Sequence, residues 1–177
     1  MKGSRNRVFL FLYALSPLHL MLITDRKSPM IAEHDIKCFK VMVELNGNFY
    51  VCPPAYQYFL QKNIPLVEYH MNTLYSEEAN DSEKDYRKDG YIWEWFFHTF
   101  CDIESAFDFV NYMDKKLHNT ESTKHPELYK IPEDARLTIL NARIPKWSLY
   151  YEGIYKEIKT EKTYASNKII YENNYIE

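Results

Sequence analysis

An alternating run from Ile36 to Leu45, followed by Asn46-Gly47, constrains the fold of this chain more than any other feature. Apolar side chains recur at every second position, namely Phe39, Val41, Val43 and Leu45. A period of two is that of a β-strand, and Asn-Gly supplies the two positive-φ residues of a type I′ turn. The sequence therefore predicts a β-hairpin over residues 36–52, with these four side chains on one buried face.

Further strand-like runs follow the hairpin. We expect strands over residues 56–60, 66–71, 91–100, 137–144 and 167–175. The run 91–100 is so aromatic that it predicts a central strand buried on both faces, or a strand whose outer face lines a pocket. Between the last two runs, residues 147–153 are interpreted as an aromatic loop.

One amphipathic helix is expected, over residues 102–117. Asp102 is a favourable N-cap, and Lys115 and Lys116 suit the negative end of the helix dipole. Apolar residues follow the cap at helical spacing, at Ile103, Ala106, Phe107, Val110, Met113 and Leu117. One helix among many strands predicts the α+β class, with a mostly antiparallel twisted sheet and the hairpin in the N-terminal half.

The size and charge of the chain limit its organisation and partners. With 177 residues and 46% hydrophobic content, the chain is long enough for one sizeable core, so we expect a single domain over residues 21–177. Tyr accounts for 16 residues and Gly for 4, so amphipathic rings must fill much of the core and its rim. A formal charge of −3 gives no strong signal for nucleic-acid binding.

The N-terminal segment has some features of a secretory signal. Basic residues precede the apolar run 8–15, but Ser16 and Pro17 interrupt it and no small-residue cleavage site follows. The run is also shorter than the roughly 18–20 residues of a membrane span. We expect residues 1–20 to form a peripheral apolar extension, with Met21 as an alternative start. The competing hypothesis is that residues 8–20 act as a signal or membrane anchor and the protein is exported.

The cysteines favour a reducing compartment, and hence a cytoplasmic protein. Cys38, Cys52 and Cys101 are odd in number and lack metal-ligand spacing, so they predict no metal site. No cofactor is expected either. A Cys38–Cys52 bridge across the hairpin is the alternative.

Short motifs shared along the chain carry a family resemblance. They are Cys-Phe-Lys-Val at 38–41, Phe-His-Thr-Phe at 97–100, Ile-Pro-Lys at 144–146, Tyr-Tyr-Glu-Gly at 150–153 and Tyr-Ala-Ser at 164–166. As a set they resemble an uncharacterised family of small proteins from bacteria and their phages, over about residues 21–172. The family pattern tends to have glycine where this chain has Phe96 and Trp147. The resemblance implies a phage or mobile-element origin, and a bacterial or phage-infected cytoplasm, but no activity.

A fainter similarity is to ADP-ribosyltransferase-like folds. There an aromatic motif ends a strand, a helix bearing an alanine follows, and a late strand carries a catalytic glutamate. The order of elements fits, but Ser166-Asn167-Lys168 stands where that glutamate would precede Ile169-Ile170. This similarity implies a diverged enzyme that uses NAD or another nucleotide as the alternative function.

The candidate binding residues surround two of the shared motifs. His98 is the foremost, because a polar ring at a strand end among aromatic residues could bind a ligand carbonyl or phosphate. The full set is His98, Trp95, Lys146, Tyr150, Tyr151 and Glu152. We assign no catalytic residue. The leading hypothesis is a non-catalytic domain that binds a small molecule or a protein through an aromatic pocket, and a purely structural protein is the third possibility.

Overall fold

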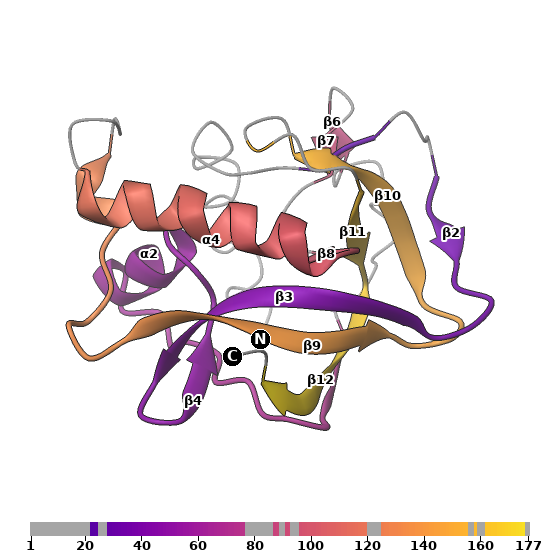
Figure 1. The fold of residues 1–177 in the computed structure, drawn as a ribbon, viewed down its shortest axis with the longest axis horizontal. Helices are drawn as coiled ribbons and strands as arrows, with labels where there is room; N and C mark the ends of the chain where they lie inside the picture. The colour runs from indigo at the N-terminus through magenta and orange to yellow at the C-terminus, as the bar shows by residue number, and fades with distance from the viewer. Residues whose placement is uncertain are drawn as a thin grey trace.

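The computed structural model describes residues 22–24, 28–76, 87–88, 91–92, 96–119, 125–155, 158 and 162–175. Within these residues the strands form a mostly antiparallel, strongly bent sheet accompanied by two α-helices (Figure 1). The α+β class predicted from the sequence is confirmed at this level, although strands dominate. The extension expected over residues 1–20 lies outside the described residues.

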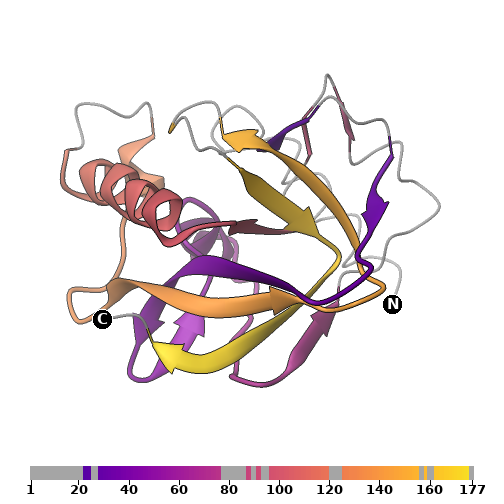
Figure 2. The ribbon, with the colours of Figure 1, turned by 45° about the vertical axis from the view of Figure 1, so that its right-hand side comes forward.

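The sheet has a continuous order from one edge to the other. Its strands are, in sequence of pairing, β5 (Leu74–Ser76), β12 (Lys168–Tyr175), β9 (Arg136–Ile144), β3 (Ile36–Leu45), β8 (Phe97–Phe100), β11 (Thr163–Ser166), β10 (Leu149–Tyr155), β1 (Leu22–Ile23), β7 (Tyr91–Ile92) and β6 (Arg87–Lys88). Two short strands lie off this path: β4 (Asn48–Tyr50) pairs with β3, and β2 (Met30–Ile31) pairs with β10. The bend falls where β3 meets β8, which share the register pair Phe39↔Phe100 (Figure 2).

The predicted hairpin is confirmed as β3 and β4. Asn46 and Gly47 have φ angles of 53° and 80°, as the tight turn requires. The prediction of a single buried face is wrong, because Met42 is as inaccessible as Val41 and Val43. The reason is that β3 is a central strand, with one core packed on each face of the sheet.

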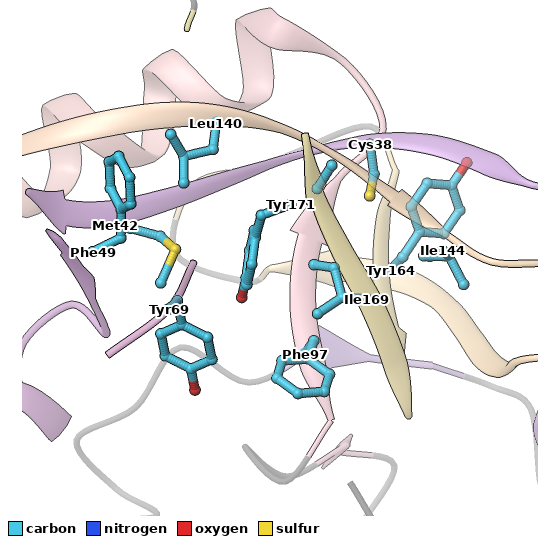
Figure 3. Close-up of a cluster of buried hydrophobic side chains, with 11 residues drawn as sticks. Cys38, Met42, Phe49, Tyr69, Phe97, Leu140, Ile144, Tyr164, Ile169 and Tyr171 are labelled. Carbon is cyan, nitrogen blue, oxygen red and sulfur yellow. The ribbon is translucent and has the colours of Figure 1, made fainter. Parts of the chain in front are cut away.

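Of three hydrophobic clusters among the described residues, the two larger lie on opposite faces of the sheet. The first lies under the longer helix and contains Leu22, Val41, Phe96, Phe100, Ala106, Ile139, Tyr151, Tyr155 and Ala165. The second contains Cys38, Met42, Phe49, Tyr69, Phe97, Leu140, Ala142, Ile144, Tyr164, Ile169 and Tyr171 (Figure 3). Successive strand residues point to opposite faces, so neighbouring residues supply different cores. Burial on both faces, predicted for residues 91–100, is confirmed for 96–100.

The predicted helix is confirmed as α4 (Ile103–His118). The Asp102 carboxylate accepts hydrogen bonds from both the Ser105 amide and the Ser105 hydroxyl, at 2.7 and 3.0 Å. In Figure 1 this helix lies across the sheet above β3. No helix among the described residues is long and apolar enough to span a membrane.

The strand predicted over residues 56–60 is wrong, because α2 (Ala55–Gln61) occupies this segment. A mostly apolar run of five residues is too short to distinguish the two periods, whereas Pro54, immediately before Ala55, is suited to a helix start. Packing supports the helix: it lies against the 3₁₀ turn Pro126–Leu128, and Gln57 donates to the Lys130 carbonyl at 2.8 Å. Residues 66–71 are also not a strand, since only Tyr69 bridges to Phe49.

The remaining strand predictions need corrections of extent. The run 91–100 contains β7 and β8, and residues 93–95 between them lie outside the described residues. The aromatic loop predicted over 147–153 is wrong from Leu149 onward, where β10 begins. The expected strands at 137–144 and 167–175 are confirmed as β9 and β12 within one residue at each start. Strand β11 was not predicted, because its four residues show no clear period and it forms by pairing with β8 and β10 on its two sides.

Candidate functional site

His98 and Tyr151 lie in one row across three strands. His98 pairs with Ala165 on β11, and Ala165 pairs with Tyr151 on β10. Directly paired residues share a face, and two strand spacings place these Cα atoms about 10 Å apart. Ala165 is the residue between them in this row. Two of the candidate residues are thus brought to one region of the sheet.

This row faces the first core rather than solvent. The exposed fraction is 8% for His98 and 4% for Tyr151. The His98 ring lies 5.9 Å from the ring of Tyr155, and Phe96 makes an edge contact with Tyr151 at 5.8 Å. Such packing suits residues that hold β8, β11 and β10 together.

Tyr150 and Glu152 lie on the opposite face, because they alternate with Tyr151 along β10. The Tyr150 ring packs edge-on against Tyr164 at 6.0 Å. The Glu152 carboxylate lies 3.1 Å from the Lys162 ammonium, which is itself 5.8 Å above the Tyr164 ring. Both charged groups of this pair are part exposed, so the site presents two charges beside two rings.

Lys162 and the neighbouring Cys101 thiol keep their protons at neutral pH. The hydrogen bond to Glu152 raises the pKa of Lys162, despite the opposing effect of burial. Burial, together with the neighbouring Asp102, raises the pKa of the Cys101 thiol to about 11. A protonated amine and a protonated thiol are poor nucleophiles, so the arrangement is suited to binding by charge and hydrogen bonds.

Lys146 lies in the turn between β9 and β10, next to an exposed indole. Trp147 is 69% exposed, and the Lys146 ammonium lies 4.8 Å from the centre of its ring. The Trp147 backbone has a φ of 71°, and the Ser148 amide donates to the Pro145 carbonyl at 3.1 Å. A positive φ at the third position of such a turn is characteristic of type II and favours glycine. A glycine would therefore suit position 147 better than a tryptophan.

Asp35 is a residue of this region that the sequence analysis missed. One carboxylate oxygen accepts from the Lys146 amide at 2.8 Å, and the other accepts from the Arg143 guanidinium at 2.8 Å. Arg143 also lies 3.1 Å from Glu172 on β12. The bond from the Lys146 amide is the main cause that holds the pKa of Asp35 below its ordinary value; Arg143 adds to the effect and desolvation opposes it. No local signal could reveal the contact, because 111 positions separate the two residues.

The structure thus divides the candidate set. Tyr151 belongs to the first core and His98 packs against it, whereas Lys146 is exposed and Tyr150 and Glu152 lie part exposed on the other face. Trp95 lies outside the described residues. Within the part of the chain that is described, no group of three or more His, Cys, Asp or Glu side chains could hold a metal ion. No protein-family model, curated protein or solved structure matches the chain.

Proposed function

We propose that this chain is a non-catalytic binding domain. Its contact surface is the turn at residues 145–148 together with the Tyr150 and Glu152 side of β10. The observation that carries the proposal is Trp147, a large ring that is 69% exposed on a backbone with φ of 71°. A left-handed conformation at a bulky residue costs free energy, and residues strained in this way cluster at functional sites.

The chemistry of the surface suits a planar polar ligand. Trp147 and Tyr150 offer rings for stacking, while Lys146, Glu152 and Lys162 offer both signs of charge. Because Glu152 is already bonded to Lys162, the pair supports recognition better than proton transfer. A small molecule and a segment of a protein both fit this description.

His98 and Tyr151 have a supporting role in this proposal. Both are nearly inaccessible, so a ligand would meet them only after the first core opened. We therefore expect His98→Ala and Tyr151→Ala to lower the stability of the domain before they affect binding. For Tyr151→Ala the loss should be about 3–5 kcal/mol, typical of large buried rings.

The proposed setting is the cytoplasm of a bacterial cell or a phage-infected host. It rests on the family resemblance and on the cysteines Cys38, Cys52 and Cys101, which are free thiols, as is usual in a reducing compartment.

A panel of nucleotides, NAD and common metabolites, read by thermal shift, tests the function. A compound at about 100 times its dissociation constant should add roughly 2.7 kcal/mol of stability. Trp147→Ala and Lys146→Ala should each abolish that shift. The matched control is Lys116→Ala, which removes a lysine lying 5.6 Å over the Tyr112 ring on α4 and should leave the shift intact.

Two other outcomes would contradict the proposal. Turnover of NAD or a nucleotide by the pure protein, lost in Glu152→Gln, would support the alternative of a diverged ADP-ribosyltransferase-like enzyme. The emission of Trp147 is obtained as the difference between the wild type and Trp147→Phe. If no compound in the panel shifts the melting temperature or changes this emission, a purely structural protein is favoured.

A further inference from the structure

We infer, on the basis of the proposed function, that Asp35 is the positioning residue of this contact surface. Its carboxylate holds the left-handed turn that displays Lys146 and Trp147, although it precedes β3 and lies far away in the sequence. Asp35 acts through the backbone of the turn, so its effect on binding is indirect.

Every backbone amide at the centre of the turn is engaged. The Lys146 amide donates to Asp35 at 2.8 Å, the Trp147 amide to the Ala32 carbonyl at 2.8 Å, and the Ser148 amide to the Pro145 carbonyl at 3.1 Å. In return, the Ala32 amide donates to the Ser148 carbonyl at 2.9 Å. Asp35 accepts from the amide of Lys146, the residue immediately before Trp147 with its positive φ. A non-glycine residue persists at positive φ only where its surroundings determine the conformation, and these bonds do so here.

Asp35 is itself held in orientation. The Arg143 guanidinium binds the carboxylate oxygen that does not accept from Lys146, and Glu172 holds the other side of that guanidinium. Among the described residues, the charged or titratable groups that act on Asp35 are Arg143 on β9 and the neighbouring His34, with Glu172 of β12 behind Arg143. Arg143 of β9 and Glu172 of β12 therefore orient the Asp35 carboxylate, and this carboxylate holds the turn. A turn ordered before binding needs less ordering when a ligand arrives, which favours affinity.

Amide hydrogen exchange of the full chain tests this role directly. Asp35→Ala should accelerate exchange of the Lys146 amide at least tenfold. Asp35→Asn retains an oxygen acceptor without the charge and should give an intermediate rate. In the wild type, the chemical shift of the Lys146 amide proton should follow a single titration with a midpoint below 3.8, the ordinary value for this carboxyl, and Asp35→Asn should abolish it.

The matched control is Glu44→Ala. Glu44 of β3 pairs with Arg136 of β9 at 2.7 Å, and its side chain is 17% exposed against 51% for Asp35. It binds the Arg136 guanidinium rather than a turn amide. Each alanine variant removes one carboxylate–guanidinium pair whose arginine is part exposed or exposed, so the change in melting temperature should be modest in both. Only Asp35→Ala should change the Lys146 amide. An unchanged exchange rate at Lys146 in Asp35→Ala, or an equal acceleration in Glu44→Ala, would overturn the inference.

The nucleotide and metabolite panel then separates this inference from the proposed function. For a compound that shifts the melting temperature of the wild type, Asp35→Ala should reduce the shift, and Glu44→Ala should not. A full shift in Asp35→Ala would overturn the positioning role and leave the binding surface standing. A panel without any response contradicts the proposed function alone, since the exchange and titration of the Lys146 amide still report whether Asp35 holds the turn.

Discussion

Tyr171 lies at the centre of the second core with its ring 1% exposed (Figure 3). Its ring centre is 5.4 Å from that of Tyr69 and 5.6 Å from that of Tyr75. The hydroxyl is buried and has no hydrogen-bond partner within the described structure. Burial raises the pKa of this hydroxyl well above its ordinary value, so the group stays protonated. On folding, this hydroxyl loses its hydrogen bonds to water and gains none from the described residues in their place.

Tyr171→Phe should therefore leave the free energy of unfolding unchanged or raise it by up to about 1–3 kcal/mol, the usual desolvation cost of such a group. Tyr75→Phe is the control. The Tyr75 hydroxyl accepts from the His70 amide at 2.6 Å, so its loss should lower stability by about 0.5–1.5 kcal/mol. Urea unfolding followed by circular dichroism measures both changes. A loss in Tyr171→Phe as large as that in Tyr75→Phe would show that the buried hydroxyl is satisfied in solution.

Trp147 carries backbone strain that two small substitutions can separate. Trp147→Gly and Trp147→Ala both remove the ring, but only glycine adopts a φ of 71° freely. Glycine relieves about 1–2 kcal/mol of left-handed backbone strain, and the greater entropy of glycine in the unfolded chain offsets part of this gain. Trp147→Gly should thus be more stable than Trp147→Ala by about 0.5–1 kcal/mol in chemical denaturation. Equal free energies of unfolding for Trp147→Ala and Trp147→Gly would mean that the turn relaxes in solution.

At the scale of elements, α4 depends on its N-cap. The Asp102 carboxylate accepts from the Ser105 amide and hydroxyl and from the Cys101 thiol. Burial opposes ionisation of Asp102, but these hydrogen bonds together hold its pKa below the ordinary value. The ionised form is therefore the one that stabilises the folded state. Its contribution is complete above the unfolded-state pKa of about 3.9 and is lost as the pH falls through the lower folded-state value.

Asp102→Ala should lower the free energy of unfolding by about 0.5–2 kcal/mol near neutral pH, as loss of a cap does. The difference from the wild type should shrink as the pH falls below about 3.9, because the unfolded chain binds a proton at this carboxyl before the folded cap does. Asp108→Ala removes the same charge from an exposed position within the helix and should cost far less. Denaturation at pH 7 and pH 3 measures the effect. A difference that is constant between the two pH values would rule out the ionised cap.

At the scale of the whole molecule, the two cores share their strands. Val41 belongs to the first core and Met42 to the second, and both lie on β3. Strands β8, β9 and β11 likewise contribute to both cores. Loss of either core would leave one face of these strands exposed, so the cores should unfold together.

Val41→Ala should lower stability by about 1–3 kcal/mol and Met42→Ala by about 2–5 kcal/mol, through lost burial and a residual cavity. Both variants should shift one common transition, seen at the same temperature by far-ultraviolet and near-ultraviolet circular dichroism. Val67→Ala, at a side chain that is 52% exposed, is the control and should change little. Two separate transitions, each sensitive to one variant, would show that the cores are independent.

The sequence by itself determined the elements whose signals are local. Asn46-Gly47 specifies a hairpin because its backbone preference acts within a few residues. Asp102 specifies the start of α4 for the same reason, since an N-cap bonds an amide three positions later. The period of two in β3 predicted a strand, but it could not show that the sheet is covered on both faces.

Tertiary structure decided the elements and contacts that depend on distant partners. Residues 55–61 became a helix where they pack on the 3₁₀ turn, and β11 exists because β8 and β10 pair with it. Once residues 149–155 are known to be a strand, alternation separates Tyr151 from Tyr150 and Glu152. The contact of Asp35 with the Lys146 amide exists only because the bent sheet brings the two segments together. Local preference acts over a few residues, whereas pairing and burial depend on where the whole chain passes.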